Sequence, residues 1–388
     1  MRFLLRALLG LVTLLSLFLI AFKAHFGGEL LRFPSPAPPL PLLISEADIE
    51  KRLEVVASLP VAPGNVAVST TGRVFITFHP EGRPVGDKLV EIVAGQPVAF
   101  PNAQLQGDAG QPSLDTPLGV RIDSKGRLWV IDHGFHGLRQ PRLWAFDTAT
   151  RATVVRYDVP AAIAGVGSFL QDLAVDPEGR YVYIADASVI GGKPAIVVYD
   201  SQAGTAVRVL QGHDSVRDRP YLVRAKGKPM RLLGALFNVH VAIDSIALDR
   251  QGQWLYYGAM SHESLFRART SDLCDRSLSA DDLGRRVERF GPKVQTDGIT
   301  TDSFGNVYLT DIEHGGITLL GADRQLRQLF TSPRVRWPDG LSFGPDGYLY
   351  IADSNLANLM MQSRGHMQAQ APYFVYRIRL NQGAPAGQ

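Results

Sequence analysis

The chain has 388 residues, of which 45% are hydrophobic and 20% are charged, which excludes a disordered or collagen-like protein and allows a large folded core. Forty basic and thirty-seven acidic residues give a net charge of +3, and this excess lies within residues 1–33, so the rest of the chain is neutral and offers no basic surface for nucleic acid. The single cysteine, Cys274, excludes an intramolecular disulfide and a cysteine-based zinc cluster.

The N-terminal 33 residues have the pattern of a targeting segment. Arg2 and Arg6 precede an apolar run from Ala7 to Phe22, which is typical of a signal sequence. We therefore expect residues 1–33 to be a signal peptide or an uncleaved signal anchor, and the protein to be secreted or periplasmic, with a membrane contact only through such an anchor. The Pro-rich residues that follow predict an extended spacer over 34–50.

From residue 51 onward one pattern occurs six times. Each copy has a short apolar strand, a turn that ends in glycine, and a second strand rich in β-branched and aromatic residues, so each copy predicts a β-hairpin. The turn glycines are 54, 53, 73, 53 and 42 residues apart, a spacing typical of propeller blades. They are Gly72, Gly126, Gly179, Gly252, Gly305 and Gly347.

These repeats predict an all-β fold, a six-bladed β-propeller over residues 51–382, although the length alone suggests two or three domains. Two β-sandwiches would show irregular strand spacing instead. Because the chain ends one strand after the last hairpin, we expect the strand at 53–57 to close the last blade. The 73-residue step predicts an insertion at about 211–240, with a hairpin tip at 225–228 and a solvated basic face.

The residues that flank each hairpin point to one acidic channel mouth. A hairpin returns the chain to its starting end, so the residues before its first strand and after its second strand share one face of the ring. Several carboxylates near one axis repel each other, so a cation, a proton or an amine is expected among them. About half of these aspartates are instead expected to cap backbone amides. The candidate catalytic residues are Asp297, Asp339 and His262, and the candidate ligand-binding residues are Asp172, Asp244, Asp311, Asp353, Asn355, His133 and His314.

Three stretches of the sequence carry a family resemblance. They are Phe169-Leu170-Gln171-Asp172 with the strand after it, Leu255-Tyr256-Tyr257-Gly258-Ala259-Met260-Ser261, and Trp337-Pro338-Asp339-Gly340. With these, residues 50–380 resemble the major royal jelly protein and insect yellow family. The resemblance implies a secreted six-bladed propeller that binds small aromatic amines in its channel mouth or takes part in dopachrome conversion.

A more distant likeness is to the gluconolactonase and senescence-marker propellers, which are metal-dependent lactonases. Asp339 in Pro-Asp-Gly resembles one of their metal ligands, whereas Asn65 stands where they place a glutamate. This likeness implies one divalent cation such as Ca²⁺, with Asn65, Asp172, Asp297 and Asp339 as its candidate ligands.

The sequence leaves three functions open, each with a small molecule as the partner. The first is an isomerase that tautomerises a catechol-like or indole-like compound. The second is a protein that binds an amine without catalysis, and the third is a divalent-metal-dependent lactone hydrolase.

Overall fold

The computed structural model describes residues 30–34, 40–107, 113–189, 192–232, 237–345 and 347–380, together with five single positions before residue 30. Most of the predicted targeting segment and part of the spacer therefore lie outside the described residues. The prediction of an extended spacer up to residue 50 is wrong at its end, because residues from Glu46 onward form a helix capped by Ser45. Among the residues that are described, no helix combines the length and the apolar character needed to cross a membrane.

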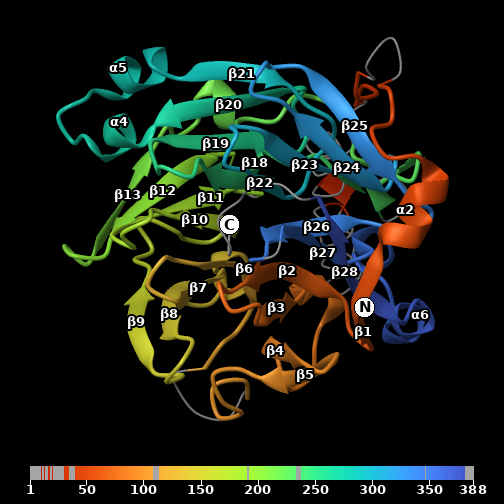
Figure 1. Ribbon diagram of the computed structural model, residues 1–388. Coiled ribbons are helices and arrows are strands. Elements are labelled where there is room, and N and C mark those ends of the chain that lie inside the picture. The colour runs from red at the N-terminus through yellow and green to blue at the C-terminus, as the bar shows by residue number, and fades with distance from the viewer. Residues whose placement is uncertain are drawn as a thin grey trace, which may run out of the picture.

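Six four-stranded antiparallel sheets surround a central channel, which confirms the predicted six-bladed propeller (Figure 1). The first five blades run in chain order from the inner to the outer strand. Their strands are β2 (Pro63–Val68), β3 (Val74–Phe78), β4 (Leu89–Val93) and β5 (Gln96–Ala99); β6 (Pro117–Ile122), β7 (Arg127–Asp132), β8 (Arg142–Asp147) and β9 (Thr153–Asp158); β10 (Leu170–Val175), β11 (Tyr181–Asp186), β12 (Ala195–Asp200) and β13 (Thr205–Val209); β18 (Ile243–Leu248), β19 (Trp254–Ala259), β20 (Ser264–Arg269) and β21 (Glu288–Pro292); and β22 (Ile299–Thr301), β23 (Val307–Asp311), β24 (Gly316–Leu320) and β25 (Leu326–Thr331).

The sixth blade joins the two ends of the folded ring. It contains β26 (Pro338–Phe343), β27 (Tyr348–Asp353) and β28 (Tyr373–Arg379), and its outermost strand is β1 (Glu54–Leu59), which pairs with β28. The prediction that an N-terminal strand closes the last blade is therefore confirmed. All six turn glycines have positive φ, the conformation for which glycine is preferred at these hairpin turns.

Only short helices connect the strands. The α-helices are α2 (Glu46–Arg52), α3 (Gly134–Gly137), α4 (Thr270–Cys274), α5 (Ala280–Arg285) and α6 (Arg364–Ala369), and the 3₁₀ helices are η1 (Pro80–Gly82), η2 (Asp214–Val216) and η3 (Leu356–Asn358). The inner strands are buried along their whole length, whereas an outer strand such as β9 alternates between half-buried and exposed residues. This gradient follows from the ring, because each inner strand is covered by both neighbouring blades.

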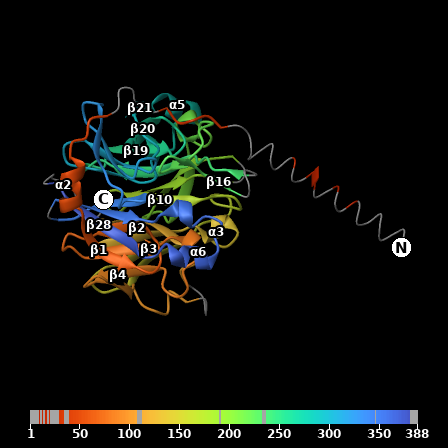
Figure 2. The same ribbon diagram turned by 90° about the vertical axis from the view of Figure 1, so that its right-hand side faces the viewer.

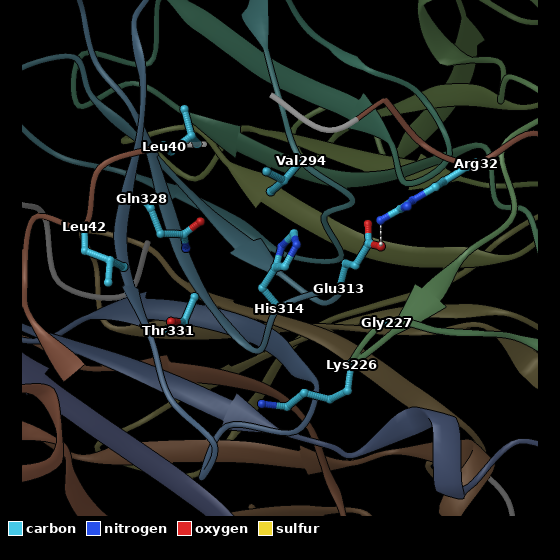
Figure 3. A pocket seen from close by; sticks show the side chains of 10 residues that line it. All are labelled: Arg32, Leu40, Leu42, Lys226, Gly227, Val294, Glu313, His314, Gln328 and Thr331. Atoms are coloured by element: carbon cyan, nitrogen blue, oxygen red, sulfur yellow. Dashed lines mark ion pairs between the residues drawn. The ribbon is translucent and has the colours of Figure 1, made fainter. Parts of the chain in front are cut away.

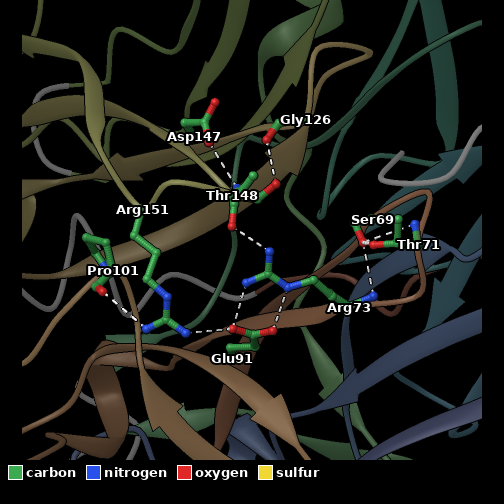
Figure 4. Close-up of polar contacts among 10 residues, drawn as sticks. Ser69, Thr71, Arg73, Glu91, Pro101, Gly126, Asp147, Thr148 and Arg151 are labelled. Carbon is green, nitrogen blue, oxygen red and sulfur yellow. Dashed lines mark hydrogen bonds and ion pairs between the residues drawn. The ribbon is translucent and has the colours of Figure 1, made fainter.

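Polar contacts join blades 1 and 2 on the side of the hairpin turns (Figure 4). Arg73 donates to both carboxylate oxygens of Glu91 at 2.6 and 2.8 Å, and it also donates to the backbone oxygen of Thr148 in the next blade. Arg151 of that blade donates to Glu91 at 3.2 Å. Each buried charge in this network has a partner, as stability requires.

The insertion lies between β13 and β18 and forms two small hairpins, β14 (Arg224–Ala225) with β15 (Lys228–Pro229) and β16 (Arg231–Leu232) with β17 (Phe237–Asn238). The predicted hairpin tip is confirmed. In Figure 2, β16 lies on the same side of the disc as α3 and α6.

The insertion covers the channel mouth. Its tip is exposed as predicted, but Val223, Met230 and Val239 are buried against Trp337 and other residues of blades 4 to 6. Arg217, Lys226, Lys228 and Arg231 are exposed, as the predicted solvated basic face requires. The apolar side chains on the inner side, which the sequence did not indicate, bury area against the ring.

Candidate functional site

A repeated irregularity at the start of the inner strands positions the site residues. In five of the six blades the register between the inner strand and its neighbour shifts near the first residues, and Asn65, Asp172, Asp244 and Asp339 each lie within such a shift. A β-bulge re-aims the side chain at its position and weakens pairing there. The bulges therefore release these polar side chains from the regular sheet at one end of the channel.

Four carboxylates from four blades are brought together and sealed from solvent. Asp172, Asp244, Asp297 and Asp339 are each at most 4% exposed. Their charges interact with one another, and the resulting repulsion is one reason that the pKa of Asp244 and Asp339 is raised, after burial as the first cause. The sequence-based expectation that these four aspartates lie close together agrees with this arrangement, which we call the acid chamber.

Arg121 on β6 extends across the channel into the acid chamber. Its Nη1 donates to Asn65 Oδ1 at 3.2 Å and its Nη2 donates to Asp172 Oδ2 at 3.0 Å. The same Nη2 lies 3.5 Å from the backbone oxygen of Ile299, on the blade opposite. Asn65 Nδ2 in turn donates to Asp172 Oδ1 at 3.1 Å, so both oxygens of Asp172 have donors.

Asp297 is held by two N–H donors. Trp337 Nε1 donates to its Oδ2 at 2.6 Å, and Gln171 Nε2 donates to its Oδ1 at 3.3 Å. Trp337 also packs under the insertion, so the covering segment and the carboxylate are linked through one indole ring.

Asp244 and Asp297 lie close enough for each carboxyl group to influence the pKa of the other. Burial and the charges of neighbouring carboxylates raise the pKa of Asp244 well above its usual range, whereas the pKa of Asp297 rises to about 6, chiefly through burial and against the pull of its donors. Their interaction raises the pKa of Asp244 and lowers that of Asp297, so Asp244 holds its proton more tightly than Asp297 does. Such a pair can take up a proton at one carboxylate and release it from the other.

Three carboxylate oxygens in the chamber lack a hydrogen-bond donor among the described residues. They are both oxygens of Asp244 and Oδ2 of Asp339. His79 Nε2 lies 3.6 Å from that Asp339 oxygen, which is beyond a normal hydrogen bond. His79 Nδ1 accepts the backbone N–H of Glu81, so its proton is on Nε2 and faces Asp339.

Lys293 places a basic side chain beside the acid chamber. Its side chain is buried, and Nζ donates to the backbone oxygens of Val294 at 3.0 Å and Met260 at 3.3 Å. Burial lowers the pKa of Lys293 to about 7, although the nearby charge of Asp244 acts in the opposite direction. Lys293 therefore changes charge near neutral pH.

Asp311 and Asp353, which the sequence nominates as ligand-binding residues, end the second strands of their blades and already have donors. Asp353 Oδ1 accepts the backbone N–H groups of Arg336 at 2.8 Å and Trp337 at 2.7 Å. Asp311 Oδ1 accepts the backbone N–H of His314 at 3.0 Å. The equivalent Asp132 and Asp186 also bind loop amides. This second set fits the expectation that some of the aspartates cap backbone amides.

Three further candidates are buried with one ring or amide nitrogen lacking a partner within the described structure: His133 Nε2, His262 Nε2 and Asn355 Nδ2. Nδ1 of His262 accepts the N–H of Ser264, and Nδ1 of His133 accepts the N–H of His136, so both rings carry their proton on Nε2. Burial lowers the pKa of both histidines, which keeps them neutral.

His314 lies elsewhere, in a pocket of about 760 Å³ (Figure 3). Its Nδ1 lies 3.0 Å from both oxygens of Asp311, and this hydrogen bond raises the pKa of His314. Lys226 of the insertion and Arg32 of the N-terminal segment line the same pocket, and Arg32 lies 3.9 Å from Glu313. His314 is thus separate from the acid chamber.

The metal-ligand candidates do not form a cation cage. Within the described ranges, no group of three or more His, Cys, Asp or Glu side chains has an arrangement that could hold a metal ion. In addition, N–H groups already donate to both oxygens of Asp172 and to both oxygens of Asp297.

Sequence reasoning missed Arg121, Lys293 and His79 as parts of the site. Arg121 could have been found by aligning the six copies, because it occupies the position of Ala67, Ala174, Ala247, Thr300 and Ser342. A charged residue where the other five copies have small ones is a clear signal. Lys293 follows an outer strand and carries no such signal.

The fold and the site define a class of protein: a six-bladed propeller with a covered, acidic channel. Within that class the family described as Major royal jelly protein matches residues 116–330, more than half of the chain, so the chain belongs to this family.

Curated relatives match over part of their length. Protein yellow of Drosophila pseudoobscura pseudoobscura is 33% identical over 109 residues, which cover 24% of this chain and 19% of the relative. Major royal jelly protein 6 of Apis mellifera is 30% identical over 158 residues, covering 38% and 34% of the two chains. The chain thus spans about a fifth to a third of the length of these relatives.

Solved structures share the fold at low sequence identity. A gluconolactonase from Xanthomonas campestris has a TM-score of 0.53 at 13% identity and covers 90% of this chain and 99% of its own. The calcium-binding protein regucalcin from Agrobacterium tumefaciens has a TM-score of 0.51 at 14% identity, covering 86% and 96%. At such identities the likeness concerns the fold alone.

Proposed function

We propose that this chain binds a small, positively charged aromatic compound, such as a catechol or indole amine, in the acid chamber. One observation carries the proposal: three buried carboxylate oxygens, on Asp244 and Asp339, lack donors among the described residues. A buried acceptor without a donor is costly, and an ammonium group supplies the donors. Its positive charge also favours the ionised form of these two carboxyl groups.

The surroundings of these oxygens suit the rest of such a ligand. Trp337 lies beside Asp297 and offers an aromatic surface to a ring or a cation. His79 Nε2 lies 3.6 Å from Asp339 Oδ2 and carries a proton that is suited to donate to a hydroxyl oxygen of the ligand. The membership of the major royal jelly protein family supports a ligand of this class.

Entry of the ligand requires that the insertion moves. All four chamber aspartates are buried, and Val223, Met230 and Val239 of the insertion pack over Trp337. We expect association to be slower than for an open site, because a conformational change precedes or accompanies binding.

A chemical step is available to the same site. Tautomerisation removes a proton from carbon and returns a proton to another atom, and the pair of Asp244 and Asp297 can accept and donate in this way. We propose dopachrome-type tautomerisation as this activity, with His262 or His133 as a further proton donor.

Calorimetry tests the binding step. We expect heat with phenolic and indole amines and none with the same rings lacking the amino group, because only the ammonium group compensates the carboxylates. Asp339→Asn is expected to weaken binding at least about 10-fold, about 1.4 kcal/mol, whereas the surface variant Asp281→Asn leaves it unchanged. Equal affinity for the amine and its neutral analogue would contradict the proposal.

The rate of dopachrome decay tests the chemical step. We expect Asp297→Asn to lower the enzymatic rate by about 10²-fold or more, since a general acid-base group contributes about this much. An unchanged rate in Asp297→Asn and Asp339→Asn would contradict a catalytic role of these residues, and no acceleration by the wild type would leave a binding protein without catalysis.

The place of action follows from the N-terminal residues. We propose that residues 1–33 direct export, so that the propeller works in the periplasm or outside the cell. Cell fractionation of the full chain and of a chain lacking residues 1–33 tests this, and a cytoplasmic full-length chain would contradict it.

A further inference from the structure

We propose that the guanidinium of Arg121 is the resident cation of this channel, and that it replaces the divalent cation that an acidic propeller channel could otherwise hold. The inference concerns the chain's own charges and does not depend on the identity of the proposed ligand.

Arg121 contacts several blades at once. It lies on the inner strand of blade 2, and its side chain reaches Asn65 of blade 1, Asp172 of blade 3 and the backbone oxygen of Ile299 in blade 5. A side chain that contacts three other blades lies across the axis of the ring. The ion pair with Asp172 is buried on both sides, so solvent screens it little.

The oxygens of Asn65 and Asp172 that face Arg121 already accept N–H groups. A hard divalent cation needs six or more oxygen ligands at 2.3–2.6 Å, with their lone pairs free. Arg121 already occupies Asn65 Oδ1 and Asp172 Oδ2, and Asn65 Nδ2 occupies Asp172 Oδ1. A metal ion at this place would have to displace the guanidinium, and the two cations would repel each other.

Arg121 is the one long side chain among the six equivalent positions of the inner strands. The other five inner strands have alanine, serine or threonine at the position of Arg121, so their side chains leave room near the axis for one long side chain. The single arginine among the six equivalent positions fills the space at the axis of the ring. Its positive charge offsets the negative charge of one of the four carboxylates. A guanidinium cannot be deprotonated in a protein, so this compensation persists at every physiological pH.

The consequence is that removing Arg121 should create a cation site. In Arg121→Met the side-chain length is largely retained, but Asp172 Oδ2 and Asn65 Oδ1 lose the guanidinium donor, and Asn65 Oδ1 keeps only the backbone N–H of Val66 at 2.8 Å. Together with the unpartnered oxygens of Asp244 and Asp339, they leave a negative centre that a divalent or trivalent cation can neutralise. We therefore expect gain of metal binding in the variant and no such binding in the wild type.

Thermal unfolding with Ca²⁺ and luminescence of Tb³⁺ excited through Trp337 measure this gain. For Arg121→Met we expect a lower Tm without metal and a rise of about 3 °C or more in excess Ca²⁺, with Tb³⁺ emission that appears on titration. The wild type should show neither response. Adding Asp172→Asn to Arg121→Met should abolish the response, because it removes a ligand oxygen.

Arg127→Met is the matched control. Arg127 belongs to the same blade and also forms an ion pair, with Asp123 at 2.6 Å, but it lies at the hairpin turn and not in the channel. This variant should lose stability without gaining a response to Ca²⁺ or Tb³⁺.

Two results would overturn the proposal. One is a folded Arg121→Met protein that shows no response to either ion. The other is a wild-type protein whose Tm responds to Ca²⁺ or whose Tb³⁺ emission appears on titration, with this response lost in Asp172→Asn. This second result can be measured even if Arg121→Met does not fold.

Discussion

Two sets of buried aspartates in this propeller differ in their donors and not in their burial. The set at the ends of the second strands, exemplified by Asp353, accepts backbone N–H groups from the loop that leads into the same blade. In the set at the start of the inner strands, Asp244 and Asp339 have oxygens without donors among the described residues. The comparison teaches that burial of a carboxylate does not by itself mark a candidate binding residue, whereas Asp244 and Asp339 are distinguished by oxygens that have no donor among the described residues.

The two sets also differ in what their loss should do. Removing a satisfied carboxylate leaves several backbone donors unpaired, and this destabilises the fold. Removing a carboxylate that has like-charged neighbours and no donor relieves electrostatic repulsion in the fold. This removal is expected to lower the affinity for the ligand and to leave the stability of the fold largely unchanged. The following four predictions test this distinction.

The largest effect is expected for Asp353→Ala. The variant leaves the N–H groups of Arg336 and Trp337 without an acceptor and removes the partner of the Arg336 guanidinium. We expect a loss of about 3–5 kcal/mol in the free energy of unfolding, measured by urea denaturation. Asp353→Asn, which keeps one acceptor oxygen, should lose less, and wild-type stability in the alanine variant would remove the distinction between the two sets.

A pH dependence of stability is expected from Asp297. Its pKa is about 3.9 in the unfolded chain and about 6 in the fold, so the folded state binds more protons between these values. The contribution of Asp297 is present below pH 4 and is lost as the pH rises through 6, by on the order of 3 kcal/mol. Urea denaturation at pH 4 to 8 measures it, and Asp297→Asn should flatten the curve in this range; an unchanged slope in the variant would contradict the assignment.

Asp244→Asn is expected to change binding more than stability. The amide can still donate to Asp297, and the substitution removes a carboxyl whose ionisation is disfavoured by its neighbours. We expect the free energy of unfolding to stay within about 1 kcal/mol of the wild type, while amine affinity falls at least about 10-fold. A loss of stability as large as that of Asp353→Ala would show that Asp244 is architectural as well.

The smallest effect is expected for Trp337→Phe. The variant keeps most of the packing under the insertion but removes the N–H that donates to Asp297 at 2.6 Å. Because this donor lowers the pKa of Asp297, the midpoint of the pH dependence should move up by about half a unit to one unit. Amine binding measured by calorimetry across pH 5 to 8 reports this midpoint, and a downward move would contradict the role of the indole.

The sequence by itself determined the architecture and the general location of the site. Six hairpins with their turn glycines specify six blades, because β-rich strands and positive-φ turns are local properties. The same repeat placed Asp172, Asp244, Asp297 and Asp339 at one end of the channel, since equivalent positions of a repeat share a face of the ring.

Only the tertiary structure decided which of the polar groups have partners. The donors to Asp172 come from other blades, through Arg121 and Asn65, and the partner of Asp297 is Trp337, 40 residues away. The apolar side of the insertion is likewise visible only once it packs on the ring. The physical reason is that hydrogen bonding and burial in a closed ring depend on contacts between distant blades, which the pattern within one blade does not contain.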